Sequence, residues 1–377
     1  MADPTGEVDL IAVGPVTVPD GVTGGALRTF EAFVVEARAA GLAVQVVDTG
    51  QASVPALARR LPTVWVAARL VGLVATNARR RRPVIWFLSG GMLRWLSPLL
   101  VPLSWTAPVV VMTFGGWLGE VVPGLPGWHR RAVVGSLGRA RLVGAQSERT
   151  VRLARAAGVR RAAATGVMRC RPETPPRLDV GDADGPVHLV YAGRVEPRKG
   201  IEALVDVVAA ADGHLTADVI GPVDPGAAAL VRLAADPPPG VRFLGQQPHD
   251  VVLAALAAAD LSVLLSTYPG EGLPGSVVES LQLGTPAVVS DHLALPELVE
   301  DGVSGFVVSP TADGWPVADL AERLGGLDAD ARRALRAGAA AAGAGHGPDR
   351  WLPLLVGPLG LTPTGRVAEP AAGPVVS

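Results

Sequence analysis

Short runs of apolar, often β-branched residues alternate with longer amphipathic stretches along the first half of the chain. Such runs predict buried strands, whereas apolar residues at helical spacing, as in residues 24–40, predict helices. The predicted strands cover residues 8–13, 43–47, 84–88, 109–112 and 142–145. Because buried strands that alternate with helices are typical of a parallel sheet covered on both faces, this half predicts an α/β domain.

The alternation stops at residues 171–186, which are rich in proline and glycine, and then restarts. The next predicted strands cover residues 188–192, 216–220, 241–244, 261–265 and 286–289. The sequence therefore predicts two doubly wound, Rossmann-like domains in tandem, residues 1–170 and 187–345, with a linker and an interdomain cleft of the kind that usually holds a ligand. A closing helical segment is expected at residues 346–362, and a disordered tail at 363–377.

The overall composition narrows the class of protein. Hydrophobic residues make up 49% of the chain and the formal net charge is −2, which supplies large cores and gives no sign of a nucleic-acid binder. Cys170 is the only cysteine, which excludes an internal disulfide and fits a reducing cytoplasm. Acidic residues near the start argue against a secretory signal, and prolines interrupt the apolar stretch 96–113, so no spanning helix is expected.

A basic loop follows the predicted strand at residues 188–192. It begins with Gly193 and carries Arg194, Arg198 and Lys199 before a predicted helix that starts near Gly200. Cations at the carboxyl end of a parallel strand, beside a helix N-terminus, favour an anion, and Arg and Lys both suit a diphosphate. A solvated basic loop explains this segment equally well when it is considered alone.

A second segment carries two carboxylates. Glu271 lies in a glycine-rich loop, and Glu279 lies on the predicted helix that follows. A carboxylate can accept two charge-assisted hydrogen bonds from a pair of ribose hydroxyls, and backbone amides at residues 274–276 could hold a phosphate. The alternative is a capped surface helix with an ordinary N-terminal acid.

Together the two segments resemble the donor-site signature of family 4 of the retaining glycosyltransferases, which have the GT-B fold. The resemblance extends from Val187 to Val308 and agrees in order and spacing. The matching stretches are Ala259–Ser266, Glu271–Pro274, Glu279, Gly284–Val289, Leu295–Val299 and Asp301–Gly305.

The resemblance implies a role for each matched residue. Arg194 and Lys199 would hold the donor diphosphate and stabilise it as it leaves, Glu279 would bind the ribose, and Glu271 would lie near the donor sugar. Further donor contacts are implied for Gly193, Gly272, Leu273, Pro274 and Gly275. In the amino-terminal domain, Gly24 and Gly25 resemble the family's glycine-rich loop, where glycine lets the backbone approach phosphate closely.

The implied reaction is retaining transfer of a sugar from a nucleoside diphosphate sugar to a hydroxyl, with a lipid-linked sugar or growing glycan as the expected acceptor. No metal or other cofactor is expected, and the D-x-D sequence at Asp182–Asp184 is interpreted as a coincidence because it lies in the linker. A dehydrogenase is disfavoured, since Gly14-Pro15 replaces a G-x-G-x-x-G turn. A sugar-nucleotide epimerase or phosphorylase of similar fold, and a non-catalytic GT-B protein that binds a glycan or partner, stay open as alternatives.

One position departs from the family pattern. Many members carry a histidine in a T-F-H-like context, whereas this chain has Thr113-Phe114-Gly115-Gly116-Trp117. Backbone groups of Gly115 and Gly116 could replace the histidine, the alignment could be shifted, or activity could be weakened.

The amino-terminal half is also rich in tryptophan and has a run of four arginines. These residues are Trp65, Trp86, Trp95, Trp105, Trp117, Trp128 and Arg79–Arg82. Cations beside tryptophan could seat the protein on an anionic membrane, which leads to the hypothesis of a cytoplasmic protein at the inner membrane face. The alternative, in which the tryptophans fill the core and the arginines form a solvated helix end, is slightly favoured.

Overall fold

The computed structural model describes residues 8–16, 25–49, 62–115, 117–170, 172–174, 176–179, 185–312 and 314–363. The chain divides into two compact units. Unit 1 comprises Met1–Cys170 and Gly347–Ser377, and unit 2 comprises Arg171–His346. The expectations for Gly24, Gly116, the D-x-D sequence and the tail from residue 364 onward lie outside the described residues.

Unit 1 contains a six-stranded sheet whose paired strands all run parallel, in the order β2-β1-β3-β4-β5-β6. Its strands are β1 (Leu10–Gly14), β2 (Val44–Asp48), β3 (Val84–Leu88), β4 (Val109–Thr113), β5 (Leu142–Ala145) and β6 (Ala162–Ala164). Every residue of β1, β3 and β4 is buried, as a sheet covered on both faces requires. The predicted α/β architecture is therefore confirmed for this unit.

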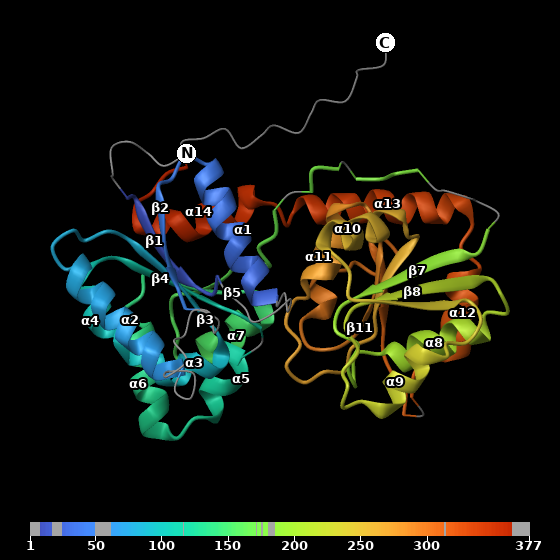
Figure 1. Ribbon diagram of the computed structural model, residues 1–377, viewed down its shortest axis with the longest axis horizontal. Coiled ribbons are helices and arrows are strands. Elements are labelled where there is room, and N and C mark those ends of the chain that lie inside the picture. Colours follow the sequence, from blue (N-terminus) through green and yellow to red (C-terminus); the bar gives the residue numbers. More distant parts are fainter. Residues whose placement is uncertain are drawn as a thin grey trace, which may run out of the picture. The chain divides into compact units, whose positions relative to one another are not determined.

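Helices cover both faces of this sheet (Figure 1). One face packs against α1 (Gly25–Ala39) and α14 (Pro348–Val356), which follows unit 2 in the sequence and belongs to unit 1. Trp351 of α14 is buried there, with its ring 6.4 Å from that of Phe33. The other face packs against α2 (Pro62–Asn77), α3 (Gly90–Leu96), η3 (Ser97–Leu99), α4 (Leu100–Thr106), α5 (Trp117–Gly124), α6 (Gly127–Leu137) and α7 (Glu148–Ala156).

The apolar stretch at residues 96–113 forms the short elements η3 and α4 and then strand β4. Its prolines lie at the start of η3, inside α4 and just before β4, where each limits the length of a helix. Within the described part of the chain, no helix combines the length and apolarity needed to cross a bilayer.

The tryptophans of the sequence hypothesis whose side chains are described divide into two groups, and the Trp117 side chain lies outside the described residues. Trp86 on β3 is 1% exposed and belongs to the core, and Trp65 on α2 is half-buried. In contrast, Trp95, Trp105 and Trp128 are 59%, 70% and 72% exposed. The favoured prediction that the tryptophans fill the core is therefore right for Trp86 and wrong for these three.

Unit 2 contains a second six-stranded sheet with parallel pairing throughout, in the order β12-β11-β10-β7-β8-β9. Its strands are β7 (Val187–Ala192), β8 (Leu215–Ile220), β9 (Val241–Gly245), β10 (Leu261–Leu264), β11 (Ala287–Ser290) and β12 (Gly305–Val308). Because all strands are parallel, the segments that follow β7, β10 and β11 leave the sheet at one edge. Both sheets of the predicted doubly wound pair are thus present.

The helices of unit 2 form two groups on opposite sides of this sheet (Figure 1). Helix α8 (Ile201–Ala210) contacts α12 (Val317–Gly325), and α11 (Gly275–Gln282) contacts both α10 (His249–Ala258) and α13 (Ala329–Ala344). The remaining helices are α9 (Ala228–Ala235) and η4 (Leu295–Glu297). Part of the predicted linker also packs in this unit, since the Arg177 N–H donates to the carbonyl of Leu283 at 2.9 Å.

Candidate functional site

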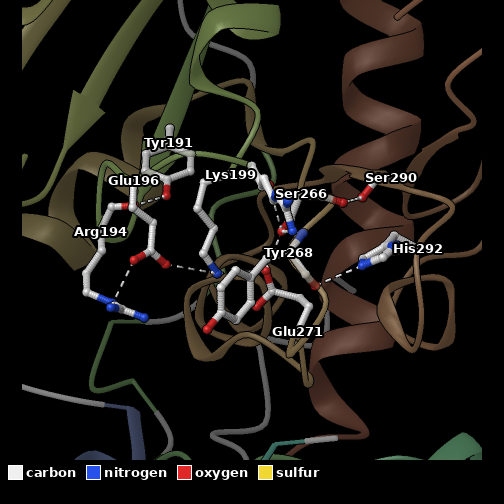
Figure 2. A network of polar contacts seen from close by, with 10 residues as sticks. Tyr191, Arg194, Glu196, Lys199, Ser266, Tyr268, Glu271, Ser290 and His292 are labelled. Atoms are coloured by element: carbon white, nitrogen blue, oxygen red, sulfur yellow. Dashed lines mark hydrogen bonds and ion pairs between the residues drawn. The ribbon is translucent and has the colours of Figure 1, made fainter. Parts of the chain in front are cut away.

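The candidate site of unit 2 is built from loops at the carboxyl edge of its sheet. Strand β10 lies between β7 and β11, so the segments after these three strands are brought together although they are far apart in the sequence. These segments and the last residues of β7 and β11 carry the polar network of Figure 2, whose labelled residues are Tyr191, Arg194, Glu196, Lys199, Ser266, Tyr268, Glu271, Ser290 and His292. The network joins the basic loop to the acidic loop that the sequence analysis considered separately.

Lys199 and Glu271, predicted from different motifs, form a direct ion pair. The Lys199 Nζ lies 2.7 Å from Glu271 Oε2 and 3.9 Å from Glu196 Oε1, and 4.9 Å from the centre of the Tyr268 ring. The Lys199 and Glu271 side chains are only 12% and 9% exposed. Lys199 is also the only lysine among the 33 basic residues of the chain.

Backbone geometry explains why Lys199 reaches this position. Gly200 caps α8 with a φ of 78°, and a Cβ at this residue would lie 2.2 Å from the carbonyl oxygen of Leu265. Only glycine fits there, because the left-handed conformation and the close approach both exclude a side chain. The Arg198 carbonyl accepts from the Thr267 N–H at 2.7 Å, which fastens the basic loop to the loop after β10.

The carboxylate of Glu271 is held by a second contact. The Ser266 hydroxyl donates to Glu271 Oε2 at 2.5 Å, while the Ser290 hydroxyl donates to the Ser266 carbonyl. His292 Nε2 lies 2.8 Å from the carbonyl of Tyr268, and because a carbonyl only accepts, this contact requires a proton on Nε2. The loop that carries Glu271 is thereby fixed to the ends of β10 and β11.

Arg194 lies at the exposed side of the same loop. Its side chain is 63% exposed, and Nη1 lies 3.0 Å from Glu196 Oε2. Its carbonyl accepts from the Tyr191 hydroxyl at 2.6 Å, and burial raises the pKa of Tyr191 well above its usual range. Gly193, which precedes Arg194 in the sequence, is exposed. The structure therefore brings Arg194 into the network through Glu196, which sequence reasoning did not select.

Glu279 occupies a separate position on α11. It is 6% exposed, and its Oε1 lies 3.3 Å from Nε2 of His249, the first residue of α10. His249 was not predicted, because thirty residues separate it from Glu279 and no motif contains it. The two predicted carboxylates are thus held by different partners, Lys199 for Glu271 and His249 for Glu279.

The start of α11 corrects one detail of the prediction. Pro274 is the N-cap residue and has no N–H, so it offers no amide to a phosphate. The amides available ahead of the first intrahelical hydrogen bond are those of Gly275, Ser276 and Val277, since the Val278 N–H already donates to the Pro274 carbonyl. Gly272 is half-buried and Leu273 is buried beside them.

The predicted glycines of unit 1 are placed only in part. Gly25 begins α1, and a Cβ there would meet no atom within 4 Å, so packing does not require a glycine. Gly115, at the position of the missing histidine, has a φ of 66°. Its N–H donates to Gln146 Oε1 at 2.9 Å. That amide is therefore engaged within unit 1.

The comparison with known families adds an independent observation. Residues 186–327, which include all of the network just described, match the family model described as "Glycosyl transferases group 1". This match places residues 186–327, which lie within unit 2, among the group 1 glycosyltransferases. The matched range contains the predicted residues of unit 2 and ends before α13.

Two curated proteins match this chain over part of its length. The amylovoran biosynthesis glycosyltransferase AmsK of Erwinia amylovora is 28% identical over 153 residues, which cover 38% of this chain and 37% of AmsK. The D-inositol 3-phosphate glycosyltransferase of Nocardia farcinica is 32% identical over 173 residues, or 43% of this chain and 37% of the relative. The match thus spans little more than a third of each relative.

Solved structures match this chain over most of its length. The structure of Anabaena Alr3699/HepE in complex with UDP and glucose has a TM-score of 0.61 and 18% identity, covering 92% of this chain and 96% of that one. This likeness establishes the GT-B fold, with a Rossmann-like sheet in each unit. Among the described residues, no three His, Cys, Asp or Glu side chains are grouped so that they could hold a metal ion.

Proposed function

We propose that this protein is a retaining, metal-independent glycosyltransferase that transfers a sugar from a nucleoside diphosphate sugar to a hydroxyl group. The observation that carries the proposal is the position of the only lysine. Lys199 lies at the carboxyl edge of the unit 2 sheet, against Glu271, within the stretch that matches the family model. Carboxyl edges of parallel sheets are where α/β proteins hold nucleotides.

In this proposal Lys199 and Arg194 bind the donor diphosphate. Lys199 offers three N–H donors, so its contact with Glu271 leaves others for phosphate oxygens. Arg194 is 63% exposed, so its guanidinium can reach a ligand beside its contact with Glu196. The amides of Gly275, Ser276 and Val277, at the positive end of α11, would add neutral donors.

Glu279 would accept hydrogen bonds from the ribose hydroxyls, with His249 orienting its carboxylate. Burial supports this role, because a nearly buried carboxylate that is held in place loses little freedom when it binds a pair of hydroxyls. A uridine nucleotide is the first base to test, since the HepE structure of the same fold contains UDP. Gly25, the first residue of α1, and Gly24, which precedes it in the sequence, are proposed as further donor contacts.

The proposed chemistry needs no separate general base. The bond between the anomeric carbon and the phosphate oxygen breaks, and a new bond to the acceptor oxygen forms on the same face of the sugar. The acceptor proton passes to the departing phosphate, while Lys199 and Arg194 stabilise the charge that develops there. Glu271 would hold Lys199 in place and face the donor sugar. The acceptor is proposed to be a lipid-linked sugar or a growing glycan.

Isothermal titration calorimetry with UDP, GDP and ADP tests the donor site. We expect one nucleotide to bind, and Lys199→Ala and Glu279→Gln each to weaken it by on the order of 10–100-fold, because a charge-assisted hydrogen bond contributes about 1.5–3 kcal/mol. Arg232→Ala, an exposed arginine of α9 in the same unit, is the matched control and should bind as the parent protein does.

Other outcomes point to the alternatives. A folded protein that binds no nucleotide would indicate a non-catalytic GT-B protein. A bound nucleotide sugar that is converted without any acceptor would indicate an epimerase. Where transfer occurs, the anomeric configuration of the product, read by NMR, decides between retention and inversion. Activity that disappears after chelation and returns with a divalent ion would refute metal independence.

A further inference from the structure

The outer surface of unit 1 carries exposed tryptophans on one helical layer. Helices α2, α3, α4 and α6 lie together on one face of the sheet, opposite α1 and α14 (Figure 1). Their inner sides belong to the core, yet Trp95 on α3, Trp105 on α4 and Trp128 on α6 are each more than half exposed. Large aromatic side chains that stay on the surface mark an interaction site when they gather.

Two of these tryptophans are held together by His129. The His129 ring lies 5.2 Å from the Trp128 ring in a stacked arrangement, and 5.6 Å from the Trp95 ring. His129 Nε2 also donates to the carbonyl of Arg94 at 2.7 Å, which ties the start of α6 to α3. We call Trp95, His129 and Trp128 the aromatic cluster. Its rings are fixed before any partner binds, which lowers the entropy lost on binding.

One arginine contacts this cluster, and two more follow it directly on α6. The Arg94 guanidinium lies 5.2 Å from the centre of the Trp95 ring, and Arg130 and Arg131 follow His129 on α6, where both are exposed. Residues 62–147 contain ten arginines and one carboxylate, Glu120, although the whole chain has a formal charge of −2. Positive charge is therefore concentrated in the part of the sequence that forms this layer.

We propose that the aromatic cluster and its arginines, Arg94, Arg130 and Arg131, dock unit 1 on an anionic lipid bilayer. Indole rings prefer the headgroup region of a bilayer, where the apolar ring is covered and its N–H stays hydrated. Arginines beside them are attracted to anionic headgroups. Because residues 62–147 contain only one carboxylate, little negative charge in this part of the protein would repel the anionic headgroups. This inference goes beyond the donor site and does not depend on it.

Co-sedimentation with vesicles tests the proposal. We expect the full chain to bind vesicles that contain phosphatidylglycerol, to bind phosphatidylcholine vesicles weakly, and to dissociate in high salt. Because each arginine near an anionic surface contributes about 1 kcal/mol, or about fivefold, Arg130→Glu with Arg131→Glu should lower the partition coefficient by at least about 25-fold. The double variant Trp95→Ala/Trp128→Ala should bind these vesicles more weakly than the parent protein, and low salt should not restore its binding.

The matched control reverses two exposed arginines of unit 2, Arg232→Glu with Arg333→Glu, and should leave vesicle binding nearly unchanged. Equal binding to both vesicle types, or cluster variants that bind like this control, would overturn the proposal. A concentration-dependent dimer that the tryptophan variants abolish, without vesicle binding, would identify a second copy as the occupant. Nucleotide titration of the same variants keeps this test separate from the donor site, because their affinity should not change.

Discussion

Removing the charge of Lys199 should destabilise unit 2 in a way that depends on Glu271. In Lys199→Met the side chain keeps its length but loses its ammonium group, so Glu271 remains nearly buried with the Ser266 hydroxyl as its remaining donor. Removing one partner of a buried ion pair costs about 3–5 kcal/mol, because the other charge is left uncompensated. Since Ser266 still donates to Glu271, we expect the lower end of this range, about 3 kcal/mol.

A double-mutant cycle adds Glu271→Gln, which should restore part of the stability that Lys199→Met loses. With a neutral amide at residue 271, no buried carboxylate is left unpaired, so Lys199→Met/Glu271→Gln should be more stable than the sum of the single variants implies. We expect a coupling energy of about 2 kcal/mol between the two sites. Arg333→Met provides the control. Its partner Asp330 is 90% exposed, and exposed ion pairs contribute less than about 1 kcal/mol.

Fluorotyrosine labelling makes the assay specific for unit 2. The chain contains two tyrosines, Tyr191 and Tyr268, and both lie in unit 2, so urea unfolding followed by ¹⁹F NMR reports that unit alone. A coupling energy below about 0.5 kcal/mol would refute the reasoning, because independent sites are additive within that range. The Lys199–Glu271 contact would then contribute no more than an exposed pair.

Three further predictions concern single positions. Gly200→Ala should destabilise unit 2 by at least about 2 kcal/mol in the same fluorine assay, because it combines a left-handed backbone with a clash on the Leu265 carbonyl. Trp351→Ala should lower the stability of unit 1 by about 3–5 kcal/mol and leave the tyrosine signals unchanged, since its ring is buried in unit 1. Although Cys170 is exposed, partial desolvation of its thiol and the Glu36 carboxylate raise its pKa to about 11, so this thiol ionises less than an ordinary one at mildly alkaline pH. Alkylation followed by mass spectrometry should therefore be slow and should accelerate in Glu36→Gln, which lowers that pKa.

Sequence patterns located most strands of both sheets to within two residues. Strand β3 agrees with its predicted bounds, because a run of five apolar residues between polar residues is the length of a buried strand and too short for a helix. Strand β6 was missed, since Ala162–Ala164 has neither β-branched residues nor enough length to stand out from a helical alanine run. Strand β6 forms because it pairs with β5, and this pairing cannot be recognised from the residue types of β6 alone.

The sequence predicted the residues of the candidate site that lie within a continuous motif, but not the contacts between residues of different motifs. Lys199 and Glu271 each stand in a recognisable loop, but their contact across 72 residues depends on β10 pairing directly with β7. Ser266 offered a weak signal as a polar residue at the end of an apolar strand. His249 offered none, because its approach to Glu279 depends on how α10 packs against α11.

The main difference between motif and structure concerns charge. Considered as a sequence, the loop at residues 193–200 presents free cations suited to a diphosphate. In the folded chain Lys199 faces Glu271 and Glu196, and Arg194 faces the other oxygen of Glu196, so two cations are matched by two carboxylates. A diphosphate that binds here must therefore share these cations with carboxylates already in contact with them. Neutralising a carboxylate, as in Glu271→Gln, should therefore strengthen binding of the nucleotide alone, even if the same variant transfers the sugar more slowly. Tighter binding together with slower transfer would separate the electrostatic effect of Glu271 on binding from its proposed role in the reaction.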